Sequence, residues 1–321
     1  AVIDPRFEAL KRYVAGSPGP LDDALALLGR LATHLIAVDD ALTRKLMPPA
    51  SDASRELASR AQLAPEPLQA MLGQLAQTSA AQELAALREP LARRMASELT
   101  PACLRALAGR YPLQRTAREE VSRAEFSRMF ASGGVIDGFF QRYLAPYADT
   151  TAHPWAYRAV DGSRVEPSES LPQFQRAQRL REAYFHDNGR TLGARLEFRL
   201  LELDAGIGQF TLDVDGQALH FGRESKLAQA VYWPAAGGTG RVKLQVVPMA
   251  GGSGSNYVFE GPWALFRLFD RVRIDPGPSA DRMQLLFDVE GRKARFEVRS
   301  MTSLNPLLRG ELEQFQCPKR P

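Results

Sequence analysis

Four histidines are the first side chains to consider for chemistry, because imidazole is the commonest general base near neutral pH. They are His34, His153, His186 and His220. A helix that binds zinc through two histidines needs a pattern such as H-E-x-x-H, and the chain does not contain it. His220 alternates with Leu219 and Phe221, which indicates a strand position facing away from the apolar side. The histidines therefore predict neither a catalytic base nor a metal site.

Two carboxylates, Asp213 and Asp215, fall on one face of an expected strand. Paired acids can share acid–base work when their environments differ. Leu212 and Val214 alternate with them and form the apolar face of the same strand. We therefore interpret the two carboxylates as the solvent side of that strand.

The run Gly251-Gly252-Ser253-Gly254-Ser255 has the composition of a phosphate-binding loop or a nucleophile elbow. A phosphate-binding loop ends in Gly-Lys-Ser/Thr, and an elbow leads from a strand into a helix. Here the next residues, 256–259, have the composition of a strand. The run predicts a hairpin loop that a partner could order, and no catalytic or cofactor-binding residue.

Composition limits the classes that remain. The chain has 321 residues, 45% of them hydrophobic and 24% charged, which suits about two globular domains. It contains no apolar run of about 18 residues and no signal-peptide pattern, and it starts at Ala1. We therefore expect a fragment whose membrane anchor or export signal lies upstream. The net charge of +4 is spread along the chain, which argues against nucleic acid as a partner.

The elements that must position any site change character along the chain. Up to about residue 150 the spacing is helical, as in the leucine stripe of residues 21–38, and Pro90 and Pro101 are expected at helix starts. From about Leu192 the period is two, and Asp215-Gly216 is typical of a hairpin turn. The sequence predicts an α+β multidomain fold, in which an all-α helical domain precedes an antiparallel β-sandwich with short packed helices. The expected domains are 1–147 (helical), 148–190 (linker and connecting helix) and 191–321 (β-sandwich with a C-terminal helix).

Three blocks of sequence are similar to one known family. The first runs from Gly109 to Tyr147 and includes Phe126 to Phe130 and the run Gly133 to Phe140. The second is Glu260-Gly261-Pro262-Trp263-Ala264-Leu265-Phe266-Arg267-Leu268-Phe269-Asp270, and the third begins at Asn305-Pro306 and ends at Cys317-Pro318. In these blocks the chain resembles the C-terminal periplasmic region of the TssM/IcmF family, the inner-membrane core proteins of type VI secretion systems. Residues 1–100 are only compatible with it.

The resemblance implies a function without catalysis. Members are anchored in the inner membrane, bind the outer-membrane lipoprotein TssJ and assemble with TssL. The resemblance thus implies a non-enzymatic periplasmic scaffold that links the two membranes, forms a homo-oligomer in the assembled complex, and needs no cofactor or metal.

The two cysteines leave two readings open: a structural disulfide in an oxidising compartment, or two free thiols. The periplasmic location implied by the resemblance permits a Cys103–Cys317 disulfide. Such a bond would tie the last residues to the helical part of the chain.

We place the expected lipoprotein contact on two neighbouring loops of the β-domain, residues 248–256 and 233–240, because their glycines leave backbone groups free and loops on rigid scaffolds commonly bind partners. The candidate residues are Trp233, Gly237, Gly238, Met249, Gly251, Gly252, Ser253 and Asn256. The competing interpretations are hairpin connections that contact nothing, a domain for self-association, and a peptidoglycan-binding or cell-wall-processing module. No acid pair or aromatic platform in the sequence supports the last of these.

Overall fold

The computed structural model describes residues 4–16, 18–158, 168–251 and 253–320. The chain forms two compact units. The first comprises Ala1–Thr100, Phe140–Pro172 and Pro318–Pro321, and the second comprises Pro101–Phe139 and Gln173–Cys317. The domain boundaries expected after residues 147 and 190 remain a prediction. Gly252, part of the expected loop contact, lies outside the described residues.

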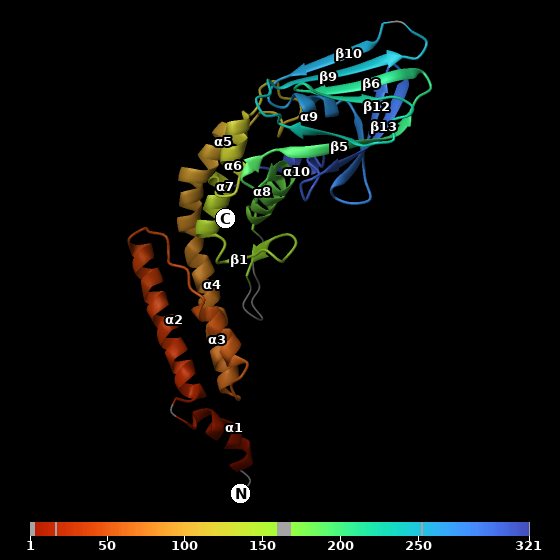
Figure 1. The fold of residues 1–321 in the computed structure, drawn as a ribbon. Helices are drawn as coiled ribbons and strands as arrows, with labels where there is room; N and C mark the ends of the chain where they lie inside the picture. The colour runs from red at the N-terminus through yellow and green to blue at the C-terminus, as the bar shows by residue number, and fades with distance from the viewer. Residues whose placement is uncertain (1–3, 17, 159–167, 252, 321) are drawn as a thin grey trace. The chain divides into compact units, whose positions relative to one another are not determined.

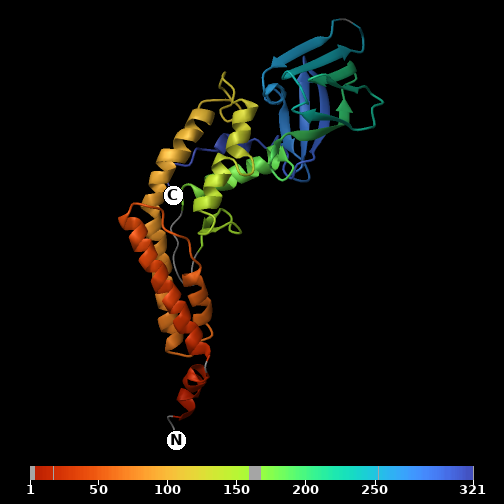
Figure 2. The same cartoon turned by 60° about the vertical axis from the view of Figure 1, so that its left-hand side comes forward.

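The first unit is mainly helical. Its helices are α1 (Asp4–Val14), α2 (Pro20–Thr43), α3 (Ala53–Ala61) and α4 (Leu68–Arg94), and a π-helical turn follows at Met95–Leu99. The two-residue strands β1 (Ala148–Asp149) and β2 (Ala156–Tyr157) pair with each other in the same unit. Helices α2, α3 and α4 lie side by side in both views (Figures 1 and 2). Proline at the first position of α2 suits a helix start, and the Asp22 carboxylate accepts a hydrogen bond from the Gly19 N–H at 2.9 Å.

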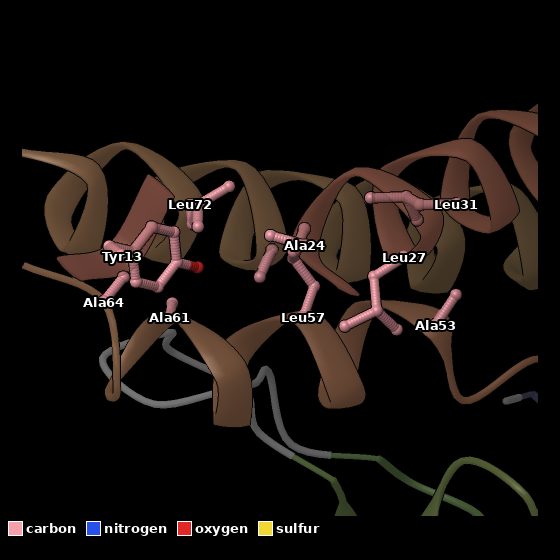
Figure 3. Close-up of a cluster of buried hydrophobic side chains, with 10 residues drawn as sticks. Tyr13, Ala24, Leu27, Leu31, Ala53, Leu57, Ala61, Ala64 and Leu72 are labelled. Carbon is pink, nitrogen blue, oxygen red and sulfur yellow. The ribbon is translucent and has the colours of Figure 1, made fainter. Parts of the chain in front are cut away.

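The core of this unit consists of leucines packed against alanines (Figure 3). Leu27 and Leu31 of α2 are buried with Leu57 of α3, and Ala61 and Ala76 leave room for the helices to approach closely. Tyr13 of α1 joins the same cluster. The helix predicted for residues 21–38 is confirmed, but its buried face differs from the leucine stripe, because Leu27 is buried and Leu25 is 55% exposed. Pro90, however, lies inside α4 and not at a helix start, and it is buried beside Leu91.

The second unit combines helices with two antiparallel sheets. Its helical elements are α5 (Thr100–Leu107), α6 (Arg123–Phe130), α7 (Val135–Tyr143), α8 (Leu171–Tyr184), α9 (Ala264–Phe269) and α10 (Gly310–Gln314), with α5, α7 and α8 each extending into the first unit. The Ser122 hydroxyl accepts the Glu125 N–H at 3.1 Å, which caps α6. A small hairpin of β3 (Phe185–His186) and β4 (Thr191–Leu192) follows α8.

One sheet has the order β10-β9-β6-β7 and the other the order β11-β12-β13-β5-β8. The strands are β5 (Ala194–Leu203), β6 (Ile207–Val214), β7 (Gln217–Phe221), β8 (Gln229–Trp233), β9 (Arg241–Pro248), β10 (Ser255–Glu260), β11 (Arg273–Pro276), β12 (Arg282–Val289) and β13 (Arg292–Ser300). Phe210 of β6 packs on Phe287 and Phe296 of the other sheet, with ring centroids 5.1 and 4.9 Å apart. Helices followed by packed antiparallel sheets with short helices confirm the predicted fold class. No helix among the described residues is long and apolar enough to cross a membrane.

Candidate partner-binding surface

The rigid base of the β-domain is an aromatic cluster around Trp263, whose side chain is fully buried. The Trp263 ring lies 4.9 Å from Phe126 and 5.0 Å from Trp233, centroid to centroid. Phe130 packs on Phe315 at 5.1 Å. Phe126 and Phe130 belong to the first of the three sequence blocks that resemble the family, Trp263 to the second and Phe315 to the third. Trp233 is one of the residues that the sequence placed in the partner contact. The blocks therefore mark the core that holds the helical segments of this unit to its sheets.

Glu120 fixes the turn that introduces Trp263. Its carboxylate accepts hydrogen bonds from the Trp263 backbone N–H at 3.2 Å and from Arg267 at 2.9 Å. The Trp263 indole N–H donates to the Val121 carbonyl at 2.7 Å. Gly261 precedes this turn with a φ of +118°, and a Cβ there would lie 2.7 Å from the Glu120 carboxylate. The glycine is thus required both by its backbone conformation and by the close carboxylate.

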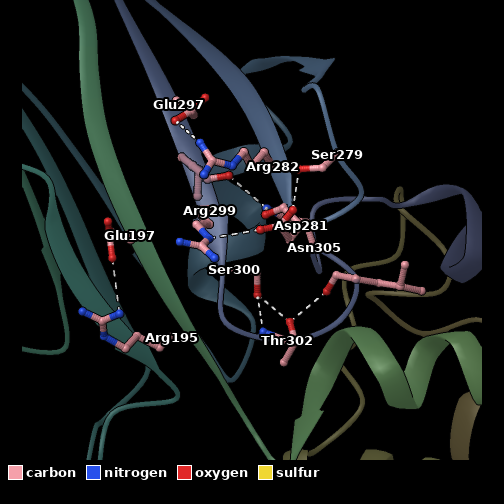
Figure 4. A network of polar contacts seen from close by, with 12 residues as sticks. Arg195, Glu197, Ser279, Asp281, Arg282, Glu297, Arg299, Ser300, Thr302 and Asn305 are labelled. Atoms are coloured by element: carbon pink, nitrogen blue, oxygen red, sulfur yellow. Dashed lines mark hydrogen bonds and ion pairs between the residues drawn. The ribbon is translucent and has the colours of Figure 1, made fainter.

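Residues after β13 are held by a buried asparagine (Figure 4). The Asn305 amide donates to the backbone carbonyls of Asp281 and Val298 at 2.9 and 3.0 Å, and its oxygen accepts the Leu307 N–H at 3.0 Å. All three partners are backbone groups, which an apolar side chain could not satisfy. Asn305 therefore sets the path of the chain toward α10.

A disulfide joins Cys103 of α5 to Cys317, with the two Cα atoms 5.7 Å apart. Gln316, the preceding residue, donates its backbone N–H to the Gln173 side chain at 2.8 Å. The bond closes a segment of 214 residues within the second unit. Of the two readings left open by the sequence, the structure contains the bonded one.

The two loops expected to bind a partner lie at opposite ends of one strand. β9 follows the 233–240 loop and leads into the 248–256 loop, and its eight residues span roughly 25 Å. The loops therefore do not form one continuous patch. This could have been deduced from the strand pattern between them.

The end of the sheet that carries the 248–256 loop is built from three loops, residues 204–206, 222–228 and 249–254, of which 252 lies outside the described residues. We call this the three-loop end. The Met249 N–H donates to the Gly206 carbonyl at 2.8 Å, and Arg223 donates to the carbonyl of Ala205. Phe221, which pairs with Phe210 of β6, places the loop after it at the same end. Leu227 and Met249 are 82% and 52% exposed there, beside exposed Gly251, Ser253 and Asn256. Sequence reasoning missed Leu227, because no periodic pattern marks a single apolar residue in a loop.

The opposite end, with the 233–240 loop, is largely occupied by the protein itself. Gly240 is buried, and a Cβ there would lie 2.4 Å from the Gly261 carbonyl and 3.2 Å from Arg123. Gly238 lies against the Asp215 carboxylate, whereas Gly237 is exposed. This end therefore offers a partner less accessible backbone than the three-loop end does.

Trp233 is buried in the aromatic cluster, with only 2% of its surface exposed. Its ring lies 4.6 Å from Phe266 and 6.4 Å from Tyr184. Tyr232, its neighbour on β8, faces solvent instead. Trp233 thus positions the loop that follows it, and its indole does not present a surface to a partner.

The groups considered for chemistry have structural partners. The Asp215 carboxylate accepts the backbone N–H groups of Gly240 and Arg241 at 2.7 and 2.8 Å, and Asp213 accepts that of Gly216 at 2.7 Å. Both acids therefore hold turns in place. In the described part of the chain, no group of three or more His, Cys, Asp or Glu side chains is placed to hold a metal ion.

The sequence patterns did not predict one polar cluster, formed by Ser54, Glu83 and His34. In the first unit Glu83 accepts a hydrogen bond from the Ser54 hydroxyl at 2.6 Å and lies 3.6 Å from the His34 ring nitrogen, with His34 and Glu83 both largely buried. The carboxylate stands between serine and histidine, so the imidazole is not placed to take the serine proton. This arrangement joins α2, α3 and α4 and is not a nucleophile triad.

Comparison with known proteins identifies the family. A family model described as the type VI secretion protein IcmF C2-like domain matches residues 196–302. The chain is 31% identical over 329 residues to the type VI secretion system component TssM1 of Pseudomonas aeruginosa. The chain belongs to the TssM/IcmF family. The TssM1 alignment covers 99% of this chain and 30% of the relative, so the chain spans under a third of that protein's length.

Solved structures show the same fold as this TssM/IcmF chain. The C-terminal domain of the TssM protein from EAEC matches with a TM-score of 0.62 and 22% identity, covering 73% of this chain and 97% of that one. A chain of a type VI secretion system membrane core complex matches with a TM-score of 0.65 and 21% identity, covering 90% and 60%. The family model extends from β5 to just after β13 and thus includes both ends of β9.

Proposed function

We propose that this TssM/IcmF chain is a non-enzymatic periplasmic part of a type VI secretion membrane complex, and that it docks a TssJ-type outer-membrane lipoprotein. In the full-length protein an upstream anchor and a TssL-type partner would complete the link to the inner membrane. The relationship to TssM1 supports this assignment. The observation that carries the docking role is the three-loop end, where glycines and two exposed apolar side chains stand on a rigid sandwich.

The three-loop end suits protein recognition for a physical reason. Exposed Leu227 and Met249 can be buried against a partner, and methionine adapts its shape to irregular surfaces. Gly251 has a φ of +77° and open space around it, so its backbone can be approached closely. Binding at useful affinity would bury on the order of 1,200–2,000 Å² in total, which requires more of this end than the two side chains alone.

A pair of variants tests this location. Met249→Asp together with Leu227→Asp should weaken lipoprotein binding at least tenfold, since it places two charges in a surface that must lose water. The matched control carries the same change at Met301→Asp and Leu201→Asp, which are also exposed but lie outside the three loops. Equal affinity of both double variants, measured by calorimetry, would contradict the proposed location.

A further inference from the structure

The four edges of the two sheets are protected unequally. Edge strands leave a row of backbone N–H and C=O groups unpaired, and proteins usually block them with side chains, prolines, charges or bulges. In this chain the outer strands are β7, β8, β10 and β11. Three of them carry such a device.

β7 and β8 are closed by two glutamines. Gln217 of β7 donates to the Tyr232 carbonyl at 2.8 Å and accepts the Tyr232 N–H at 2.9 Å. Gln229 of β8 accepts the His220 N–H at 3.0 Å and donates to the His220 carbonyl. Each side-chain amide therefore takes the place that a neighbouring strand would occupy.

β11 is protected in another way. It has only four residues, ends at Pro276, and carries an ion pair between Arg273 and Asp275 at 3.1 Å. A short, charged strand with a proline is a poor template for a further strand.

β10 is less protected: it has no proline and no bulge, and its one charged residue, Glu260, is the last of the strand. It lies at the outer border of its sheet (Figure 1). Its sequence, SNYVFE, contains no proline or lysine, and its six residues pair with β9 without a shift in register. Tyr257 and Val258 are 40% and 43% exposed. The strand is therefore uncovered and regular, with apolar side chains on both faces.

The hydrogen-bond pattern shows which residues of β10 face the open edge. Gly261 donates its N–H to the Gly240 carbonyl opposite it, at 2.9 Å. Because inward and outward backbone groups alternate along an antiparallel strand, Phe259 and Tyr257 also direct theirs toward β9. Asn256, Val258 and Glu260 therefore present their N–H and C=O groups to the open edge.

This edge is complementary to itself. In an antiparallel pair of two β10 strands centred on Val258, that residue would oppose its own copy and Asn256 would oppose Glu260, each exchanging both backbone hydrogen bonds. On the other face Tyr257 would oppose Phe259, an aromatic pair across the strands. Glu260 is the only charged residue of β10, so no like charges meet.

We propose that β10 pairs with β10 of a second copy of this chain, about a two-fold axis through Val258, to form one continuous eight-stranded sheet. The contact does not involve the lipoprotein and runs along the β10 edge, which adjoins the three-loop end at Asn256. An edge-to-edge contact buries less than a standard interface, so the free fragments should associate weakly. Copies held close together in one assembly would pair at their high effective concentration.

Cysteine cross-linking tests both the pairing and its register. Directly opposite residues of a hydrogen-bonded pair have Cα atoms about 5.5 Å apart, which a disulfide can bridge. Oxidised glutathione should therefore convert the Val258→Cys variant to a covalent dimer at least tenfold faster than Leu227→Cys, which is more exposed but off the axis. An equimolar mixture of Asn256→Cys and Glu260→Cys should cross-link faster than either variant alone.

A charged side chain in place of Val258 provides a second test of the pairing. Val258→Lys would place two like charges opposite each other on the two-fold axis. It should therefore abolish the concentration-dependent dimer that analytical ultracentrifugation detects, whereas Val258→Thr should retain that dimer. Unchanged circular dichroism and melting of both variants would confirm that they fold. Cross-linking of Val258→Cys at the Leu227→Cys rate would overturn the proposal. If Val258→Lys then also removed lipoprotein binding, the β10 edge would bind the lipoprotein and not a second copy of the chain.

Discussion

At the scale of single residues, this chain uses buried and partly buried polar side chains to hold backbone in place. Glu120, Asp215 and Asn305 each accept or donate at least two hydrogen bonds with backbone or arginine partners. Sequence patterns marked Asp215 as a solvent-side acid at a hairpin turn. Its role depends on residues 25 and 26 positions away, which no local period reveals.

Asn305 provides the sharpest stability prediction at this scale. Asn305→Ala would remove one donor from each of the Asp281 and Val298 carbonyls and the acceptor of the Leu307 N–H in a buried site, although the Asp281 carbonyl keeps the Ser300 N–H. We expect a loss of about 2–4 kcal/mol in the free energy of unfolding, measured with urea. Asn256→Ala, at an exposed position, should change it by less than about 0.5 kcal/mol. Similar losses for the two variants would contradict the assigned role of Asn305.

Buried tyrosines predict an alkaline limit of stability. Burial, with a smaller contribution from Glu83, raises the pKa of Tyr147 to about 12, and burial also raises the pKa of Tyr184 above its ordinary value. Because these pKa values are higher in the folded state than in the unfolded chain, their stabilisation is complete below about pH 10 and is lost as pH rises toward 12 and beyond.

Unfolding by urea at several pH values between 9 and about 12 checks this prediction. Tyr147→Phe should flatten the decline of stability with pH, because it removes one of the groups that must ionise. Tyr232→Phe, at an exposed position, is the control and should leave the decline unchanged. A decline that is equally steep in both variants would refute the explanation.

At the scale of elements, local periodicity predicted the helices and strands well, and the failures have identifiable causes. Trp263 lies in the core together with Leu265 and Phe266, which accompany it in the sequence. Trp233 was placed among surface residues, although Val231 and Trp233 alternate with exposed Tyr232 in a pattern that indicates burial. Pro90 was expected to start a helix, but burial within the apolar face of α4 outweighs the loss of one backbone hydrogen bond.

The disulfide connects elements far apart in sequence, α5 and the last residues of the second unit. Closing a 214-residue segment constrains the unfolded chain by roughly 5 kcal/mol in the entropy model. The double variant Cys103→Ala and Cys317→Ala should lose stability of about this size in urea unfolding. Reductant should destabilise the wild-type protein and leave the double variant unaffected. An equal response of both proteins to reductant would show that the bond does not contribute.

At the scale of the whole molecule, the fold class and the family could be predicted from the sequence, whereas the accessible surface could not. Family resemblance rests on core residues such as Phe126, Trp263 and Asn305, which determine packing and are recognisable in order. Which loops share an end of the sandwich depends on strand register. The loops 204–206 and 222–228 meet the 249–254 loop because β6 pairs with both β7 and β9.

The central claim is that this chain docks an outer-membrane lipoprotein through its β-domain. The most direct measurement is calorimetric titration of the purified chain with the TssJ-type lipoprotein of the same secretion system, prepared without its lipid. We expect one-to-one binding with a Kd of about 1 μM or lower, a free energy near −8 kcal/mol. Absence of binding by a chain shown to be folded by circular dichroism would contradict it.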